Sequence, residues 1–223
     1  MMTQATIDTA DFTRMRDAMV ASQLRPNAVS DPRVVATMAR VPREAFLPAA
    51  QAALAYRDTA VPIAHGRAVN VPIATGKMLT RAELRPVDRV LLIGAAGGYT
   101  AAVLAGLVAR VVAVESDKAL LAIARPALAN YANVDLVEGD LAAGSPAGAP
   151  YDVLLVDGAV EHLPQALVDQ IAPGGRVVTG LLDRGVTRLA SGVRSAGGFG
   201  LATFADVDCV ALPGFTRPKV FTF

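Results

Sequence analysis

The chain has 223 residues, of which 53% are hydrophobic and 18% are charged, and its formal net charge is +1. This composition is typical of a compact globular protein and excludes an intrinsically disordered chain. The scattered arginines and lysines offer no electrostatic footprint for nucleic acid or an anionic membrane. The single cysteine, Cys209, excludes an internal disulfide. The first residues lack the basic start and apolar core of a secretory signal, so we expect a cytoplasmic protein.

Helices are predicted in the N-terminal part of the chain. Residues 1 to about 11 resemble a loose leader, and Thr13 to Leu24 has the apolar spacing of a helix. Ser30-Asp31-Pro32 has the residues of a helix start, and the helix that follows is expected to reach about Arg40. Val41-Pro42-Arg43-Glu44 begins another short helix in the same way. We expect these helices to form a flank or lid on the main domain.

A long irregular segment follows, from Tyr56 to Pro72. Its prolines and glycine predict a loop with short extended pieces, and loops of this length are often functional. Ile73 to Leu84 is predicted to be a helix. The turn Arg85-Pro86-Val87-Asp88 then leads into the central part of the chain.

The central stretch has the pattern of one βαβ unit. An apolar run, Val90 to Ile93, ends in the small-residue loop Gly94-Ala95-Ala96-Gly97-Gly98 and is followed by a predicted helix, Tyr99 to Leu107. A second apolar run, Val111 to Val114, ends in Glu115. Glycines allow close backbone approach, and helix N-termini present free N–H groups. Glu115 lies 21 positions after Gly94, a spacing that suits hydrogen bonds to ribose hydroxyls. The pattern predicts a nucleoside-containing ligand.

Other interpretations of this stretch are possible. Val90 to Ala109 has no charge and is long enough to span a bilayer, although its clustered glycines and its change of period favour the βαβ unit. The dinucleotide pattern G-x-G-x-x-G is broken by Ala96 and Tyr99, which disfavours an NAD-dependent enzyme. A glycine-rich turn without any ligand stays open as the alternative.

The rest of the chain continues to alternate between helix and strand, which predicts a doubly wound, mostly parallel sheet of Rossmann-like α/β type. Gly185 to Val193 fits either period, whereas Phe199 to Val207 and Lys219 to Phe223 resemble strands and predict an antiparallel C-terminal edge. The predicted elements between Glu115 and this edge are a helix at Asp117–Asn130, strands at Val134–Glu138 and Val153–Val156 (the latter ended by Asp157), a helix at Leu163–Ile171 closed by Pro173-Gly174-Gly175, and a strand at Arg176–Thr179.

Several of these segments resemble a known family. LRPVDRVLLIGAAGGYTAAVLAGL, VVAVE, VEGD, PYDVLLVDGA and APGGRVV are similar to the successive motifs of S-adenosyl-L-methionine (AdoMet)-dependent methyltransferases. VSDPRVVATMARVPREAFLP, ALAYRDTAVPI and HGRAVNVPIATGKM resemble the N-terminal region of protein-L-isoaspartate O-methyltransferases. The resemblance covers about Met19 to Val178 and returns weakly at LPGF, residues 212–215. No internal repeat or low-complexity linker appears, so we expect a single domain over 1–223, with a helical extension and substrate loop at 12–85 and a Rossmann-like core at 86–223.

The resemblance also implies roles for individual residues. Glu115 would bind the ribose hydroxyls of AdoMet. Asp157, at the end of its strand, lies where many methyltransferases place a residue facing the methyl group, although Asp157-Gly158 and Gly139-Asp140 also fit simple turns. The implied cofactor-binding residues are Gly94, Ala96, Gly98, Glu115, Asp140, Leu141 and Asp157, with Asp140 expected against the adenine.

The chain departs from the family pattern at the acceptor. The family has Ser-Gln-Pro in its substrate loop, where this chain has Asn70-Val71-Pro72, and the serine is thought to hold the acceptor carboxylate. Asn70 is therefore the implied catalytic residue. Leu92 replaces an acid before the first motif glycine, and Ala96 replaces the central loop glycine. These departures motivate the alternative of a catalytically silent partner protein that keeps the AdoMet fold.

The resemblance implies a carboxyl methyltransferase that acts on L-isoaspartyl residues of damaged proteins, or on an altered acceptor. Its partners would be isoaspartyl proteins or peptides, with no nucleic acid and no membrane, and a monomer is the default expectation. His65 and His162 lack metal-ligand spacing, so no metal site is predicted. Cys209 is expected to be a packed or partly packed core residue.

Overall fold

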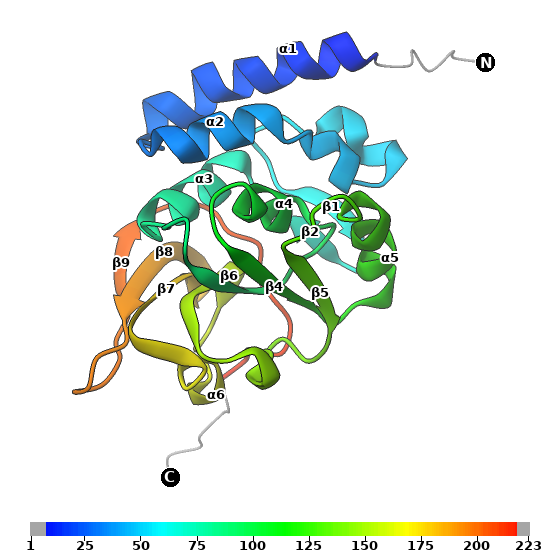
Figure 1. Cartoon of the computed structure of the whole chain (residues 1–223). Helices are drawn as coiled ribbons and strands as arrows, with labels where there is room; N and C mark the ends of the chain where they lie inside the picture. Colours follow the sequence, from blue (N-terminus) through cyan, green and yellow to red (C-terminus); the bar gives the residue numbers. More distant parts are fainter. Residues whose placement is uncertain (1–7, 218–223) are drawn as a thin grey trace.

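The computed structural model describes residues 8–217, and it begins with helices that lie above the rest of the molecule (Figure 1). Helix α1 (Thr9–Met19) continues through a π-helical turn (Val20–Leu24) and a 3-10 turn (Arg25–Asn27). It begins earlier than the predicted Thr13 because the Asp8 side chain accepts the N–H of Asp11 as an N-cap. Helix α2 (Pro32–Arg40) is capped by Asp31 as predicted. Short 3-10 helices follow at Arg43–Phe46 and Ala49–Leu54.

The predicted functional loop contains a β-hairpin. Strands β1 (Val61–Ala64) and β2 (Arg67–Val69) pair antiparallel, which confirms the expected short extended pieces. Their turn places His65 (φ 49°) and Gly66 (φ 74°) in the left-handed region. Helix α3 (Pro72–Arg81) follows and agrees with the predicted helix to within a few residues.

The main sheet has seven strands in the order β5-β4-β3-β6-β7-β8-β9. The strands from β5 to β7 are parallel, whereas β8 and β9 are antiparallel to their neighbours. This arrangement confirms the mostly parallel Rossmann-like sheet with an antiparallel edge. The elements are β3 (Arg89–Ile93), α4 (Tyr99–Ala105), β4 (Arg110–Glu115), α5 (Lys118–Ala127), β5 (Val134–Glu138), β6 (Tyr151–Val160), α6 (Gln165–Val168), β7 (Ile171–Asp183), β8 (Val186–Val193) and β9 (Ala202–Ala205).

Alternate residues of the central strands face two separate hydrophobic cores. Val90 and Leu92 of β3 pack with the N-terminal helices, α3 and α4, while Leu91 and Ile93 pack with residues around α6 and the C-terminal end of the chain. All four side chains are fully buried. The apolar run without alternation therefore reflects a strand that is covered on both faces. The N-terminal helices share the first core, so they pack on the sheet as a flank.

Three predicted boundaries after β5 are wrong. Strand β6 does not end at Asp157 but continues to Val160, because Ala159 and Val160 pair with Gly180 and Leu181 of β7. The helix expected at Leu163–Ile171 is only the short α6, Gln165–Val168. Pro173-Gly174-Gly175 lies inside β7 at a shift of the β6–β7 register and does not close a helix.

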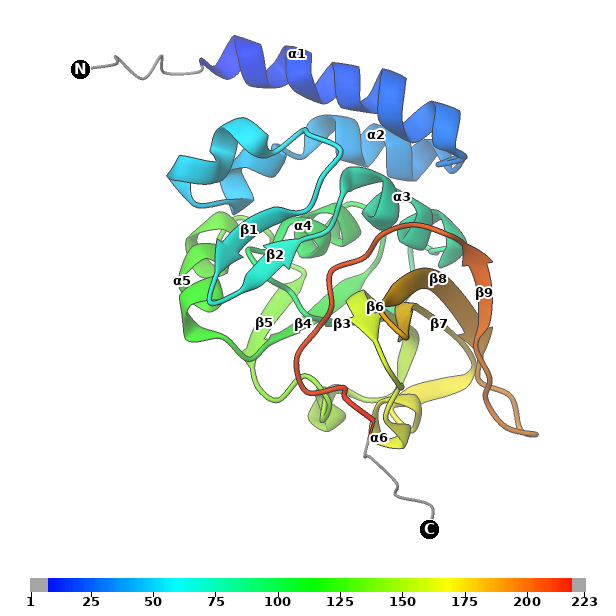
Figure 2. The ribbon, with the colours of Figure 1, turned by 180° about the vertical axis from the view of Figure 1, so that it is seen from behind.

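Residues 206–217, which we call the C-terminal segment, run from β9 back across the molecule (Figure 2). Ala159 of β6 donates its N–H to the carbonyl of Val210 at 2.7 Å and accepts the N–H of Leu212 at 2.9 Å. These bonds hold the segment beside the carboxyl-terminal part of β6. The strand predicted at Lys219–Phe223 lies outside the described residues. No helix within residues 8–217 is long and apolar enough to cross a membrane.

Candidate functional site

The glycine-rich loop between β3 and α4 has a strained backbone that hydrogen bonds hold in place. Gly94, Ala96 and Gly98 all have positive φ, at 81°, 50° and 100°. The N–H groups of Gly94 and Ala95 donate to the carbonyl of Val114 at 3.0 and 3.1 Å, which ties the loop to the end of β4. Ala96 adopts the left-handed conformation without being glycine, at a cost of about 1–2 kcal/mol.

Close packing explains why two of the loop positions are glycine. A Cβ at Gly97 would overlap the carbonyl oxygen of Phe46, from the N-terminal helices. A Cβ at Gly94 would lie 3.0 Å from the side chain of Leu212, from the C-terminal segment. The first contact is with backbone, which cannot move without its helix, whereas the second is with the end of a flexible side chain. Gly97 is therefore needed for packing, and the space above Gly94 can be cleared by one rotating side chain.

Glu115 is the most heavily hydrogen-bonded side chain of the site, and it is fully buried at the end of β4. Its carboxylate accepts backbone N–H groups from Ala96 (2.8 Å), Ser116 (2.8 Å) and Asp117 (3.1 Å). The guanidinium of Arg67, from β2, donates to both carboxylate oxygens at 2.9 and 3.1 Å. The two side chains are 0% and 8% exposed, so this is a buried, bidentate ion pair.

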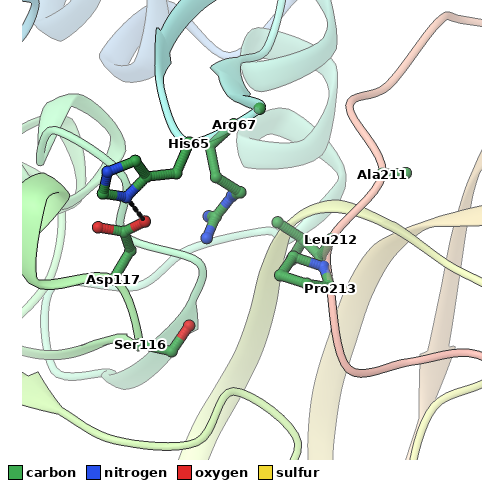
Figure 3. A pocket seen from close by; sticks show the side chains of 8 residues that line it. His65, Arg67, Ser116, Asp117, Ala211, Leu212 and Pro213 are labelled. Atoms are coloured by element: carbon green, nitrogen blue, oxygen red, sulfur yellow. Dashed lines mark hydrogen bonds and ion pairs between the residues drawn. The ribbon is translucent and has the colours of Figure 1, made fainter.

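A pocket of about 460 Å³ lies beside this ion pair (Figure 3). Its volume is within the range of small-molecule sites, about 300–1,000 Å³. The hairpin turn and the start of α5 form one wall, where His65 Nδ1 lies 2.7 Å from Asp117 Oδ2. Leu212 and Pro213 form the opposite wall, and Arg67 points between the two (Figure 3).

The arrangement fits a nucleoside ligand on two conditions. The backbone donors hold the Glu115 carboxylate in one orientation at the end of β4, beside the pocket, which suits hydrogen bonds from vicinal hydroxyls. Its lone pairs, however, are already used by five hydrogen bonds, two of which come from Arg67. Ribose hydroxyls can therefore reach Glu115 once the Arg67 side chain moves aside, and Leu212 must clear the space above Gly94.

A second cluster forms around Asn70 and Asp157, which are 87 residues apart in the sequence. Asn70 Nδ2 donates to Asp157 Oδ1 at 2.7 Å, and Thr100 Oγ1 donates to Asp157 Oδ2 at 2.5 Å. The N–H of Val210 donates to Asn70 Oδ1 at 2.8 Å. Because a backbone N–H can only donate, this bond also determines which end of the Asn70 amide faces Asp157. The cluster joins the substrate loop, the start of α4, β6 and the C-terminal segment.

The surroundings of Asp157 shift its pKa in opposite directions. Burial of its carboxyl group raises the pKa of Asp157, while the hydrogen bonds from Thr100 and Asn70 and the positive charges of Arg43 and Arg67 oppose this effect. Arg43 is 1% exposed, donates to the backbone carbonyl of Asn70 and lies 4.7 Å above the ring of Tyr99. Its Nε has no hydrogen-bond partner within residues 8–217. Arg43 is absent from the ion pairs of the described residues, whereas Arg67 is paired with Glu115, so Arg43 is the cation without an acidic partner beside this cluster.

Two of the implied cofactor residues lie apart from these groups. Asp140 is exposed, and its side chain accepts the N–H of Ala142 at 3.0 Å, as a turn acid does. Leu141 is 2% exposed and belongs to the core on the α6 face of the sheet. Neither lines the pocket. Their proximity to the site comes through the backbone, because Gly139 donates to the carbonyl of Glu115 at 3.1 Å.

Sequence reasoning missed several residues of the site, namely Arg43, Arg67, Thr100, Val210 and Leu212. Thr100 carries a local signal, since it sits in the first turn of the helix that follows the loop, and Arg43, Arg67 and Leu212 lie in segments that resemble the family. Within residues 8–217 no group of histidine, cysteine and acidic side chains could hold a metal ion. Cys209 is partly buried against the first core, as predicted.

Comparisons with known proteins identify the family of this chain. The family model described as protein-L-isoaspartate(D-aspartate) O-methyltransferase matches residues 14–211. A protein-L-isoaspartate O-methyltransferase 1 from Rhodopseudomonas palustris is 44% identical over 173 residues, covering 77% of this chain and 71% of the relative. A protein-L-isoaspartate O-methyltransferase from Herpetosiphon aurantiacus is 37% identical over 205 residues, covering 91% and 92%.

Solved structures show the same fold. A protein-L-isoaspartate O-methyltransferase structure superposes with a TM-score of 0.76 at 24% identity, covering 89% of this chain and 66% of that chain. A Plasmodium falciparum protein, provisionally assigned to the same activity and solved in complex with S-adenosyl-L-homocysteine, also gives 0.76, at 20% identity, covering 88% and 97%. From the family match over most of its length and from these relatives, the chain belongs to the protein-L-isoaspartate(D-aspartate) O-methyltransferase family of AdoMet-dependent methyltransferases.

Proposed function

We propose that this protein transfers a methyl group from AdoMet to the free α-carboxylate of L-isoaspartyl residues in damaged proteins. The observation that carries this proposal is the 2.7 Å contact between Asn70 and Asp157, which joins the substrate loop to β6 beside the start of α4. Family membership supports the same assignment. We further propose a single domain over the whole chain that acts in the cytoplasm as a monomer on protein or peptide acceptors, without nucleic acid.

The cofactor would be held by the groups at the ends of β3 and β4. Glu115 would accept the ribose hydroxyls, and the backbone of Gly94, Ala96 and Gly98 would lie against the ligand. Asp140 and Leu141 would approach the adenine through the loop after β5. When bound, the cofactor supplies the methyl group on its positively charged sulfur.

The protein's own residues would orient the acceptor and exclude water. An α-carboxyl group has a pKa of roughly 3.3–3.7, so the acceptor is ionised at neutral pH and needs no general base. Asn70 would donate an N–H to it, and Arg43, which donates to the backbone carbonyl of Asn70, would offset its charge. Holding a carboxylate oxygen in line with the bond to be broken is proximity catalysis. The buried surroundings of Asn70, which is 2% exposed, keep water away from this position.

The first test is transfer of labelled methyl from AdoMet to a short isoaspartyl peptide, with the matching aspartyl peptide as control. We expect label on the isoaspartyl peptide only. The variant Asn70→Ala should reduce the rate by about 10²-fold, the lower end of the range for an oriented hydrogen-bond donor, because charge is neutralised in this reaction and does not develop. Absence of label from both peptides, with AdoMet still bound, would contradict the proposed acceptor.

A further inference from the structure

Most of the hydrogen-bonding groups of Asn70 already have partners in the absence of an acceptor. Its Oδ1 accepts from Val210, one Nδ2 hydrogen is directed at Asp157, and its backbone carbonyl accepts from Arg43. A single Nδ2 hydrogen remains for an acceptor. An acceptor carboxylate that takes this hydrogen must therefore lie next to the carboxyl group of Asp157.

Two carboxylates that share such a site cannot both stay ionised at little cost. Like charges at hydrogen-bond distance raise one of the two pKa values strongly, and the pair then holds one proton. Among the described side chains, Arg43 balances one negative charge at this position, but not two, and in the complex with S-adenosyl-L-homocysteine the sulfur carries no positive charge. Arg67 lowers the pKa of Asp157 without a hydrogen bond to it, and its guanidinium is already paired with Glu115.

Asp157 can take up that proton without losing its contacts. Asp157 keeps part of its surface exposed, so an acceptor can reach it, while Asn70 and Thr100 hold its two oxygens. The Thr100 side chain carries a hydroxyl group, which can accept a hydrogen bond as well as donate one. Burial already favours the neutral form of Asp157, since it raises the pKa of this carboxyl group.

We propose, on the basis of the function proposed above, that Asp157 selects the acceptor by its protonation state: an isoaspartyl carboxylate binds productively only when Asp157 is protonated. The proton stays on Asp157, so the acceptor remains a nucleophile. The bond that forms joins a carboxylate oxygen to the methyl carbon, and the bond that breaks joins that carbon to sulfur. The negative charge of the acceptor and the positive charge on sulfur disappear together.

The other ionisable groups that face Asp157 keep one charge state between about pH 5.5 and about pH 8.5. Arg43 and Arg67 stay protonated in proteins. Burial raises the pKa of Tyr99 to about 12. Burial, with Asp157 and Asp208 nearby, also raises the pKa of the Cys209 thiol. A change in acceptor binding within this range therefore reports on Asp157.

The experiment compares wild type with Asp157→Asn, which is isosteric and neutral at every pH. Its Oδ1 still accepts from Asn70, and its new Nδ2 donates to Thr100. Asp183→Asn, the same change at an exposed position at the end of β7, is the matched control. For each protein, kcat/KM for the isoaspartyl peptide is measured from about pH 5.5 to about pH 8.5. Peptide binding to the complex with S-adenosyl-L-homocysteine is measured by calorimetry in two buffers of different ionisation enthalpy.

For wild type we expect kcat/KM to fall by about tenfold per pH unit above the pKa of Asp157, and peptide binding to take up about one proton. Asp157→Asn should lose both effects and exceed wild type by about tenfold or more at the highest pH. Asp183→Asn should behave as wild type. A wild type that methylates the peptide without proton uptake, and with the same pH profile as Asp157→Asn, would overturn the role of Asp157 while the proposed function stands.

A peptide that neither binds nor becomes methylated with any of the three proteins, while S-adenosyl-L-homocysteine binds them all, would overturn the proposed acceptor and with it this role. Methylation by Asp157→Asn alone at the highest pH, with wild type active at the lowest pH, would support the role most directly. The proton uptake is measured on wild type, so the proposal can be refuted even where the variant does not fold.

Discussion

The Arg67–Glu115 ion pair leads to a prediction about cofactor affinity. Arg67→Met keeps the aliphatic volume of the side chain but removes the guanidinium that occupies both Glu115 oxygens. Glu115 retains three backbone N–H donors, so its carboxylate stays oriented and lone pairs become free for ribose hydroxyls. We therefore expect the variant to bind AdoMet more tightly than wild type.

The magnitude follows from the contact that the ligand no longer has to displace. A hydrogen bond to a charged group contributes about 1.5–3 kcal/mol net. Because the ion pair is buried, desolvation of both groups offsets much of its attraction, so we count one such bond and not two. At 1.4 kcal/mol per factor of ten, the dissociation constant should fall by about 10- to 150-fold. The ligand-free variant should be less stable than wild type, because a buried carboxylate has lost its cation.

Calorimetric titration with AdoMet and thermal unfolding with and without the ligand would check both effects. Arg110→Met is the matched control, since Arg110 pairs with Asp135 at 2.6 Å on the exposed, opposite end of β4. This control should leave the dissociation constant unchanged. An unchanged or larger dissociation constant for a folded Arg67→Met protein would refute the reasoning and mean that Arg67 stays in place beside the bound ligand.

Three further predictions concern the same region. Glu115→Ala should weaken AdoMet binding by at least about tenfold, the effect of one lost charged hydrogen bond, and an unchanged titration would remove Glu115 from the site. Gly97→Ala should lower the free energy of unfolding by about 1–3 kcal/mol or more, because its Cβ would overlap the carbonyl oxygen of Phe46. Ala96→Gly should raise it by about 0.5–1 kcal/mol, because relief of the positive φ outweighs the backbone entropy that glycine loses on folding. Urea denaturation measures both, and equal effects would contradict this account. The Cys209 thiol, whose pKa is raised by burial, should react with a thiol reagent at neutral pH far more slowly in the folded than in the urea-unfolded protein, and equal rates would refute its burial.

Much of the fold could be predicted because its signals are local. The helix start at Asp31, the apolar run of β3 and the glycine-rich loop depend on neighbouring residues, and each agrees with the structure. The region after Asp157 could not be predicted as well. There β6 continues because Ala159 pairs with β7 on one side and with Ala211 on the other, which are contacts between distant parts of the chain.

The candidate site also combines features with local signals and features that depend on distant parts of the chain. The motifs of the sequence by themselves determined the family, through their resemblance to it. The sequence also predicts the place of the site, because the loop, its glycines and the acid at the end of β4 all lie within one βαβ unit. Only the tertiary structure decided which side chains surround them. Arg67 forms an ion pair with Glu115, Leu212 packs over Gly94, and Asn70 donates a hydrogen bond to Asp157. These partners come from separate segments, and no spacing in the chain encodes which side chain fills a buried position. Packing and charge compensation in the folded molecule decide that.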